Sequence, residues 1–63
     1  MKRVMWFDMY GNKVAVYHHE DDDLANDYFE IYLLLGKKRK FIDYADSYTE
    51  AANIAINFCY EHA

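Results

Sequence analysis

The sequence contains no proline and only one cysteine, Cys59, in 63 residues. A single cysteine cannot form a disulfide within the chain, so the covalent stabilisation typical of small secreted domains is excluded. This composition is typical of a reducing compartment. We therefore expect a cytoplasmic protein in which Cys59 is a small buried apolar side chain rather than a nucleophile.

Long hydrophobic runs are also missing. No segment approaches the ~18 apolar residues that a membrane-spanning helix needs, so we expect no membrane partner. The length predicts one domain, residues 1–63. A core of this size supplies only about 3–5 kcal/mol, so oligomerisation or partner binding is the expected supplement.

The motifs of the common enzyme classes are absent. There is no glycine-rich phosphate loop, no nucleophile elbow and no spaced set of cysteine and histidine ligands. His18 and His19 precede an acidic run, but neighbouring strand residues point to opposite faces and zinc needs three or four converging ligands. We predict no catalytic site, no cofactor and no metal site.

Two hairpins are predicted before residue 45. In the first, residues 2–10 and 13–18 flank Gly11-Asn12, which we predict to be a two-residue type II′ turn. This turn places Met9 opposite Val14.

The second hairpin joins residues 28–35 to residues 39–44. A two-residue loop would place Glu30 opposite Asp43, a like-charge pair that destabilises a sheet. We therefore predict a four-residue loop at residues 36–39, which pairs Leu33 with Ile42 and Ile31 with Tyr44.

The last third of the chain predicts a helix from Ser47 to His62. Ser47 and Glu50 have the spacing of a capping box, in which each side chain accepts from the backbone N–H of the other residue. The middle of the apolar arc holds small residues, which let a helix lie close to a sheet. These residues are Ala51, Ala52, Ala55 and Cys59.

Two hairpins followed by a helix predict an α+β fold: a four-stranded antiparallel sheet, β-β-β-β-α, with the C-terminal helix packed on one face. The predicted core comprises the apolar residues of the helix-facing side and of the helix itself. These are Met5, Phe7, Val14, Val16, Phe29, Ile31, Leu33, Ile42, Ala51, Ala55, Phe58 and Cys59.

One helix covers only one face of a sheet. The other face would carry Trp6, Tyr17, Tyr32 and Leu34, and a contiguous aromatic patch of this kind is typical of an interaction surface. The alternative is that the loop at residues 19–27 folds over this face.

Charge is unevenly distributed along the chain, whose net charge is −4. Four of the seven basic residues form the run Lys37–Lys40, and six of the eleven acidic residues lie between residues 20 and 30. The net charge disfavours general binding to nucleic acid phosphates. We predict that these acidic residues contact a partner, together with Trp6, Tyr17 and Tyr32. The acidic residues are Glu20, Asp21, Asp22, Asp23, Asp27 and Glu30.

The chain resembles the small acidic inhibitors encoded by bacteriophages, such as anti-CRISPR and host-takeover proteins. The resemblance lies in its short length, its acidic block Glu20–Asp23, its aromatic strands and the lack of a catalytic set. This resemblance implies stoichiometric binding to a host defence or nucleic-acid-handling protein in the host cytoplasm. The segment Asp46–Ala51 also looks like the strand-to-helix junction of small antitoxin-like domains.

We therefore expect a non-enzymatic protein that inhibits a protein partner by occluding it, with its carboxylates resembling a line of phosphates. Two alternatives stay open. One is a homodimeric structural or regulatory module. The other is nucleic-acid binding through the Lys37–Lys40 tip, with Tyr32, Phe41 and Tyr44 stacking on bases.

Overall fold

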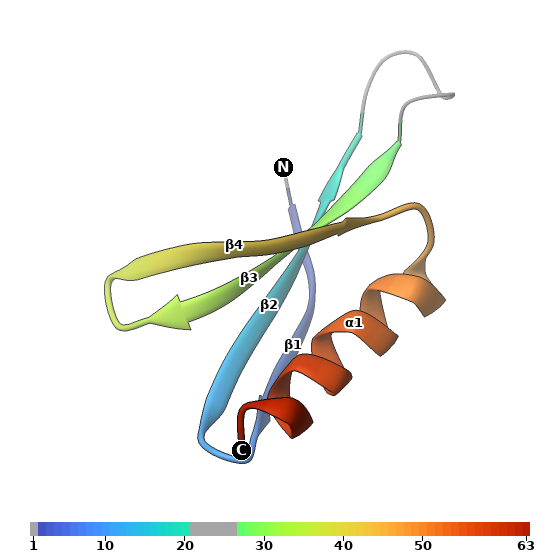
Figure 1. The fold of residues 1–63 in the computed structure, drawn as a ribbon. Helices are drawn as coiled ribbons and strands as arrows, with labels where there is room; N and C mark the ends of the chain where they lie inside the picture. Colours follow the sequence, from blue (N-terminus) through green and yellow to red (C-terminus); the bar gives the residue numbers. More distant parts are fainter. Residues whose placement is uncertain (1, 21–26) are drawn as a thin grey trace.

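The computed structural model describes residues 2–20 and 27–63. The described chain forms four strands and one helix, in the order β1-β2-β3-β4-α1 (Figure 1). Each strand pairs antiparallel with the next, so that β1 and β4 are the edges of a single sheet. The elements are β1 (Lys2–Met9), β2 (Asn12–His19), β3 (Tyr28–Leu35), β4 (Lys38–Ala45) and α1 (Tyr48–Glu61).

The predicted α+β fold is confirmed: α1 packs on one face of the sheet and contacts all four strands. Its C-terminal end lies beside the turn between β1 and β2 (Figure 1). Among the described residues, no helix has the length and apolar character that would let it cross a membrane.

The helix begins at Tyr48, and Ser47 is its N-cap, as the capping box predicts. The Ser47 hydroxyl oxygen accepts a hydrogen bond from the backbone N–H of Glu50 at 3.1 Å. The other half of the predicted capping box is wrong in detail, because the Glu50 carboxylate accepts from the N–H of Asp46 at 3.3 Å rather than from Ser47. Both bonds still satisfy backbone donors at the start of the helix, where no helical partner exists.

The first turn lies one residue earlier than predicted. Tyr10 and Gly11 form it with φ of +55° and +81°, the signs of a type I′ turn, and Met9 pairs with Asn12. Phe7 therefore pairs with Val14. From Met5 to Met9 the pairing differs from the predicted one by two positions, which leaves these side chains on their expected faces; a second shift between Arg3 and Met5 places Arg3 opposite Tyr17.

The second turn also has two residues, Gly36 and Lys37, so the predicted four-residue loop is wrong. Leu35 pairs with Lys38, and only Gly36 of the two has a positive φ, +65°, as in a type II′ turn. The chain avoids pairing Glu30 with Asp43 in another way, because a β-bulge at Ile42 shifts the register of β4 against β3.

This bulge changes which residues share a face. Tyr32 pairs with Phe41, but beyond the bulge Ile31 pairs with Asp43 and Glu30 pairs with Tyr44. Tyr44 was predicted opposite Ile31. The bulge instead places Tyr44 on the face that the helix leaves open.

The core lies between α1 and the inner sheet face. Val14, Val16 and Ile31 are fully buried there, as are the small helix residues Ala51, Ala55 and Cys59, and Phe29 and Ala45 complete this core. Five predicted core residues are only partly buried and pack against its margin: Met5, Phe7, Leu33, Ile42 and Phe58. A single short helix cannot cover the whole sheet, so its outer positions keep some exposure.

Candidate interaction surface on the open face of the sheet

The sheet face away from α1 carries a row of four residues in register across all four strands. Trp6 pairs with Ala15, Ala15 pairs with Tyr32, and Tyr32 pairs with Phe41. Ala15 is fully buried although no helix covers this side. Its large neighbours on both sides therefore close over it and form a continuous surface.

A second row runs parallel to the first. Arg3 pairs with Tyr17, Tyr17 with Glu30, and Glu30 with Tyr44. Near the end of the sheet, His19 pairs with Tyr28, and their rings stack with centroids 4.7 Å apart. Aromatic side chains thus occupy this face on every strand.

The rings contact one another across the strands. Edge-on contacts join Tyr17 to Tyr32 at 5.5 Å, Tyr32 to Phe41 at 5.6 Å and Tyr44 to Tyr28 at 5.6 Å, and a tilted contact joins Phe41 to Tyr44 at 4.6 Å. Such pairs contribute about 0.5–1.5 kcal/mol each beyond the area they bury. We call this surface the aromatic face: Trp6, Tyr17, His19, Tyr28, Tyr32, Phe41 and Tyr44.

Arg39 joins the aromatic face from the basic run. Its guanidinium carbon lies 4.5 Å from the ring centroid of Tyr32 and 5.0 Å from that of Tyr17. The Arg3 guanidinium lies 5.9 Å from the ring centroid of Trp6. Cation–π contacts at exposed sites contribute about 0.5–1 kcal/mol, and they place two cations among the rings of the aromatic face.

The Tyr32 hydroxyl is fixed within this surface. It donates a hydrogen bond of 2.8 Å to the Glu30 carboxylate. The pKa of Tyr32 is raised, first because ionisation would lose this bond, then through partial burial and the repulsion between a tyrosinate and the Glu30 carboxylate. The nearby Arg39 charge acts in the opposite direction and is smaller.

The outermost members of the aromatic face are accessible to a partner. Trp6 is 53% exposed, Phe41 41% and Tyr44 57%, whereas Tyr17 and Tyr32 are half-buried beneath Arg39. A rigid floor with protruding rings is the arrangement found at binding hot spots, where Trp, Tyr and Arg are enriched. The alternative in which residues 19–27 cover this face stays a prediction, because residues 21–26 lie outside the described part.

The predicted contact residues divide into two groups. Trp6, Tyr17, Tyr32 and Glu30 lie together on the open face, as predicted. Glu20 and Asp27 instead contact His18, whose ring stacks on the core residue Phe29 on the helix side. The remaining predicted contacts, Asp21, Asp22 and Asp23, lie outside the described residues.

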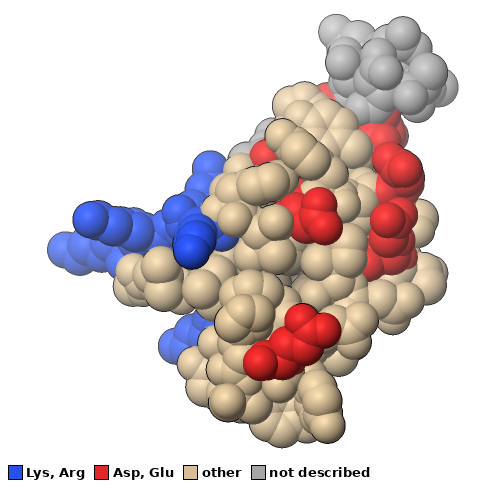
Figure 2. Space-filling model, in the orientation of Figure 1, with Lys and Arg blue, Asp and Glu red and all other residues tan. Residues whose placement is uncertain are grey.

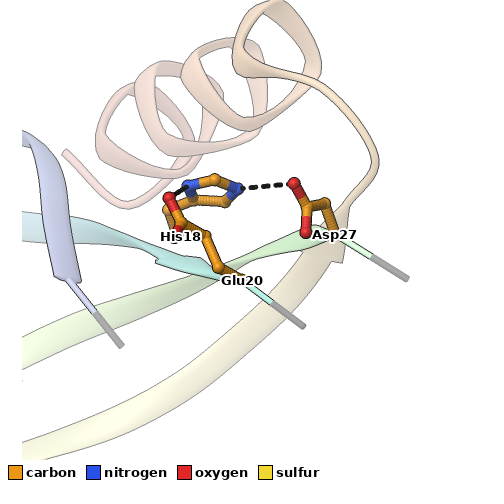
Figure 3. Close-up of polar contacts among 3 residues, drawn as sticks. All are labelled: His18, Glu20 and Asp27. Atoms are coloured by element: carbon orange, nitrogen blue, oxygen red, sulfur yellow. Dashed lines mark ion pairs between the residues drawn. The ribbon is translucent and has the colours of Figure 1, made fainter. Parts of the chain in front are cut away.

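Figure 3 shows His18 between the two carboxylates. Its Nδ1 lies 3.4 Å from Glu20 Oε1, and its Nε2 lies 3.5 Å from Asp27 Oδ2. Because the carboxylates contact opposite ring nitrogens, they do not converge with the imidazole on one ion. His19 stacks on Tyr28 on the other face, and within residues 2–20 and 27–63 no three metal-ligating side chains form a group.

Charge is segregated on the folded chain. Figure 2 shows a cluster of basic side chains at the tip of the β3–β4 hairpin and a row of acidic side chains along the opposite side, with further charged groups between them. That side holds the end of β4 and the start of α1, with Asp43, Asp46 and Glu50. Lys37–Lys40 and these carboxylates therefore give the molecule a charge asymmetry along its length.

Cys59 is fully buried between α1 and the first hairpin. Burial raises the pKa of its thiol, because the thiolate would be poorly solvated there. A buried neutral thiol is a poor nucleophile, as the sequence predicts for this residue.

Comparison with protein-family models, curated proteins and solved structures found no match to this chain. The surface of the folded chain is therefore the basis for its proposed function.

Two parts of that surface were not predicted from the sequence. Tyr44 was assigned to the wrong face because no residue pattern marks the bulge at Ile42, and nothing in the basic run Lys37–Lys40 predicted that the Arg39 side chain reaches two strands inward.

Proposed function

We propose that this chain is a non-enzymatic binding protein, which occludes the surface of a protein partner with its aromatic face. One observation carries this proposal: rings from all four strands form a continuous exposed surface where the helix provides no cover. A soluble domain seldom leaves such a patch uncovered without a binding role.

Protein is favoured over nucleic acid as the partner. Two cations lie among the rings, but Glu30 lies in the second row, and the chain carries a net charge of −4. Phosphates would be repelled by this overall charge. A protein surface with apolar and acidic groups complements the rings together with Arg3 and Arg39.

The acidic end of the molecule would act on the rate of association. Carboxylates at one end and lysines at the other orient an approaching charged partner before contact. If the partner handles nucleic acid, the acidic end would occupy its cationic cleft, and inhibition would follow from occlusion.

The test compares two pairs of exposed aromatic residues. A Trp6→Ala/Tyr44→Ala variant removes rings from the aromatic face, and a Tyr10→Ala/Tyr60→Ala variant removes rings elsewhere that are somewhat more exposed, at 62% and 69%. We expect a partner captured by the wild-type chain to bind the first variant at least tenfold more weakly and the second with unchanged affinity. Equal loss in both variants, or in neither, would contradict the proposal.

Two further measurements separate the alternatives. Sedimentation of the isolated chain at high micromolar concentration would reveal a homodimer, which Trp6→Ala should weaken if the aromatic face forms it. Fluorescence titration with single-stranded RNA at low salt would detect stacking of bases on the same rings. Tight RNA binding would indicate that the partner is a nucleic acid and not a protein.

The acidic contribution is tested separately. Replacing Asp21, Asp22 and Asp23 by Asn should slow association with the captured partner and reduce its salt dependence. An unchanged association rate would remove electrostatic steering from the proposal and leave the aromatic contact intact.

A further inference from the structure

A second surface feature lies on the helix side of the sheet. The β3–β4 hairpin projects beyond the C-terminal end of α1 (Figure 1), so the helix does not cover the inner face of this hairpin along its full length. A cavity of about 300 Å³ lies between them. Its lining comprises Leu33, Lys40, Phe41, Ile42, Phe58 and His62.

The walls of this groove are mainly apolar. Leu33 and Ile42 come from the sheet and Phe58 from the helix, and all three are half-buried. The His62 ring stacks on Phe58 with centroids 4.0 Å apart, and its Nδ1 lies 3.0 Å from the Phe58 carbonyl oxygen. Because a carbonyl oxygen can only accept, Nδ1 carries the proton, and the ring is held as a fixed wall.

The charged member of the lining is Lys40, which pairs with Leu33 in the sheet. No acidic residue belongs to the lining, and no carboxylate of residues 2–20 or 27–63 lies within ion-pair distance of Lys40. The neighbours Lys37, Lys38 and Arg39 add further positive charge at this end of the molecule (Figure 2). The groove therefore combines apolar walls with a cation that has no ionic partner there.

We infer that this groove binds a small aliphatic carboxylate. The hydrocarbon part lies against Leu33, Ile42 and Phe58, and the carboxylate faces the Lys40 ammonium group. The volume is at the lower end of the range for ligand sites, about 300–1,000 Å³, which suits a short chain rather than a long lipid. An organic cation of the same shape would be repelled by Lys40. This inference is independent of the proposed function, because Phe41 at the edge of the sheet is the one residue that the groove lining shares with the aromatic face, and the contacts invoked here come from Leu33, Ile42, Phe58 and Lys40.

The test uses three ligands with the same eight-carbon body and different head groups: octanoate, octylammonium and 1-octanol. Each is titrated into the full-length chain, and binding is followed by chemical shifts of the groove residues. We expect octanoate to shift the signals of Leu33, Ile42 and Phe58 with a dissociation constant on the order of 1 mM. Octanol should bind about threefold to fivefold more weakly and octylammonium at least tenfold more weakly.

Matched variants assign the site. Lys40→Gln should weaken octanoate binding by about threefold to fivefold, and added salt should weaken it in the wild-type chain. Lys2→Gln changes the net charge equally but lies on the opposite edge strand, and Trp6→Ala removes a ring of the aromatic face. Neither should change the affinity for octanoate.

Three results would overturn the inference. They are equal binding of all three ligands, unchanged octanoate affinity in Lys40→Gln, and ligand-induced shifts that map to Trp6, Tyr17 and Tyr44 instead of Leu33, Ile42 and Phe58.

Discussion

The side-chain amide nitrogen of Asn12 lies 3.2 Å from the carbonyl oxygen of Cys59, residues separated by 47 positions in the chain. The same nitrogen lies 3.1 Å from the carbonyl oxygen of His62. The first residue of β2 therefore donates to two carbonyl groups at the C-terminal end of α1, where the helix itself supplies no donors. This contact fixes the helix end to the first hairpin.

We expect Asn12→Ala to lower the free energy of unfolding by about 1–2 kcal/mol, since two hydrogen bonds are lost. Asn12→Asp should be at least as destabilising, because a carboxylate would face two carbonyl oxygens and the negative end of the helix dipole. Urea denaturation followed by circular dichroism measures both. Asn53→Ala, at an exposed helix position, is the control and should change stability by less than about 0.5 kcal/mol.

Gly36 occupies the first central position of the β3–β4 turn with φ of +65°. A Cβ added there would meet no atom within 4 Å, so Gly36→Ala tests the backbone conformation alone. The left-handed conformation of an alanine should cost about 1–2 kcal/mol of stability. Lys37→Ala, in the same turn without a positive φ, should be nearly neutral, and equal effects in thermal or urea unfolding would argue against the assigned turn.

Tyr32 should titrate above its ordinary pKa of 10.0, because its hydroxyl donates to the Glu30 carboxylate. Glu30→Gln should lower this pKa toward 10.0, as measured by ultraviolet absorbance of tyrosinate. A group whose pKa is raised by folding stabilises the folded state below its unfolded pKa. That contribution should be lost as the pH rises through the folded pKa of Tyr32.

The matched control for this titration is Tyr60→Phe, which removes one exposed tyrosine from another surface. In the Tyr60→Phe variant the late-titrating component should persist, whereas in Tyr32→Phe it should disappear. Its persistence in Tyr32→Phe would show that another tyrosine is responsible.

Cys59 should resist alkylation in the folded chain, because its thiol is inaccessible and burial raises its pKa above the ordinary 9.0. Mass spectrometry after exposure to iodoacetamide should show reaction slowed, relative to the urea-unfolded chain, in proportion to the small fraction of molecules that expose the thiol. The neutral thiol contributes stability that is present below pH 9.0 and lost as the pH rises through the folded pKa.

Cys59→Ala should therefore show a shallower loss of stability above pH 9.0 than the wild-type chain, whatever its stability at neutral pH. The comparison uses slopes because the substitution also leaves a small cavity. Parallel slopes would show that the thiol stays neutral for reasons other than burial, or that other groups dominate in this range.

Much of the interaction surface could be predicted from the sequence. Trp6, Tyr17, Glu30 and Tyr32 were assigned to the open face correctly, since alternation along a strand determines the face of each residue. Tyr44 was not, because the Ile42 bulge reverses that alternation within β4. A bulge in β4 and a longer loop would both keep Glu30 from pairing with Asp43. No pattern in the sequence shows which of the two the chain uses.

The sequence by itself determined the elements, their order and the sides they present: two hairpins, a capped helix with small central residues, and an aromatic face opposite that helix. These are local properties, set by periods of two and of 3.6 residues and by the Ser47 cap. Only the tertiary structure decided the registers and the contacts at long range. A register shift of two positions keeps a side chain on the same face of the sheet. The hydrophobic pattern therefore does not show that Tyr10-Gly11 is the turn. In the folded chain this turn places Asn12 where its amide reaches the end of the helix.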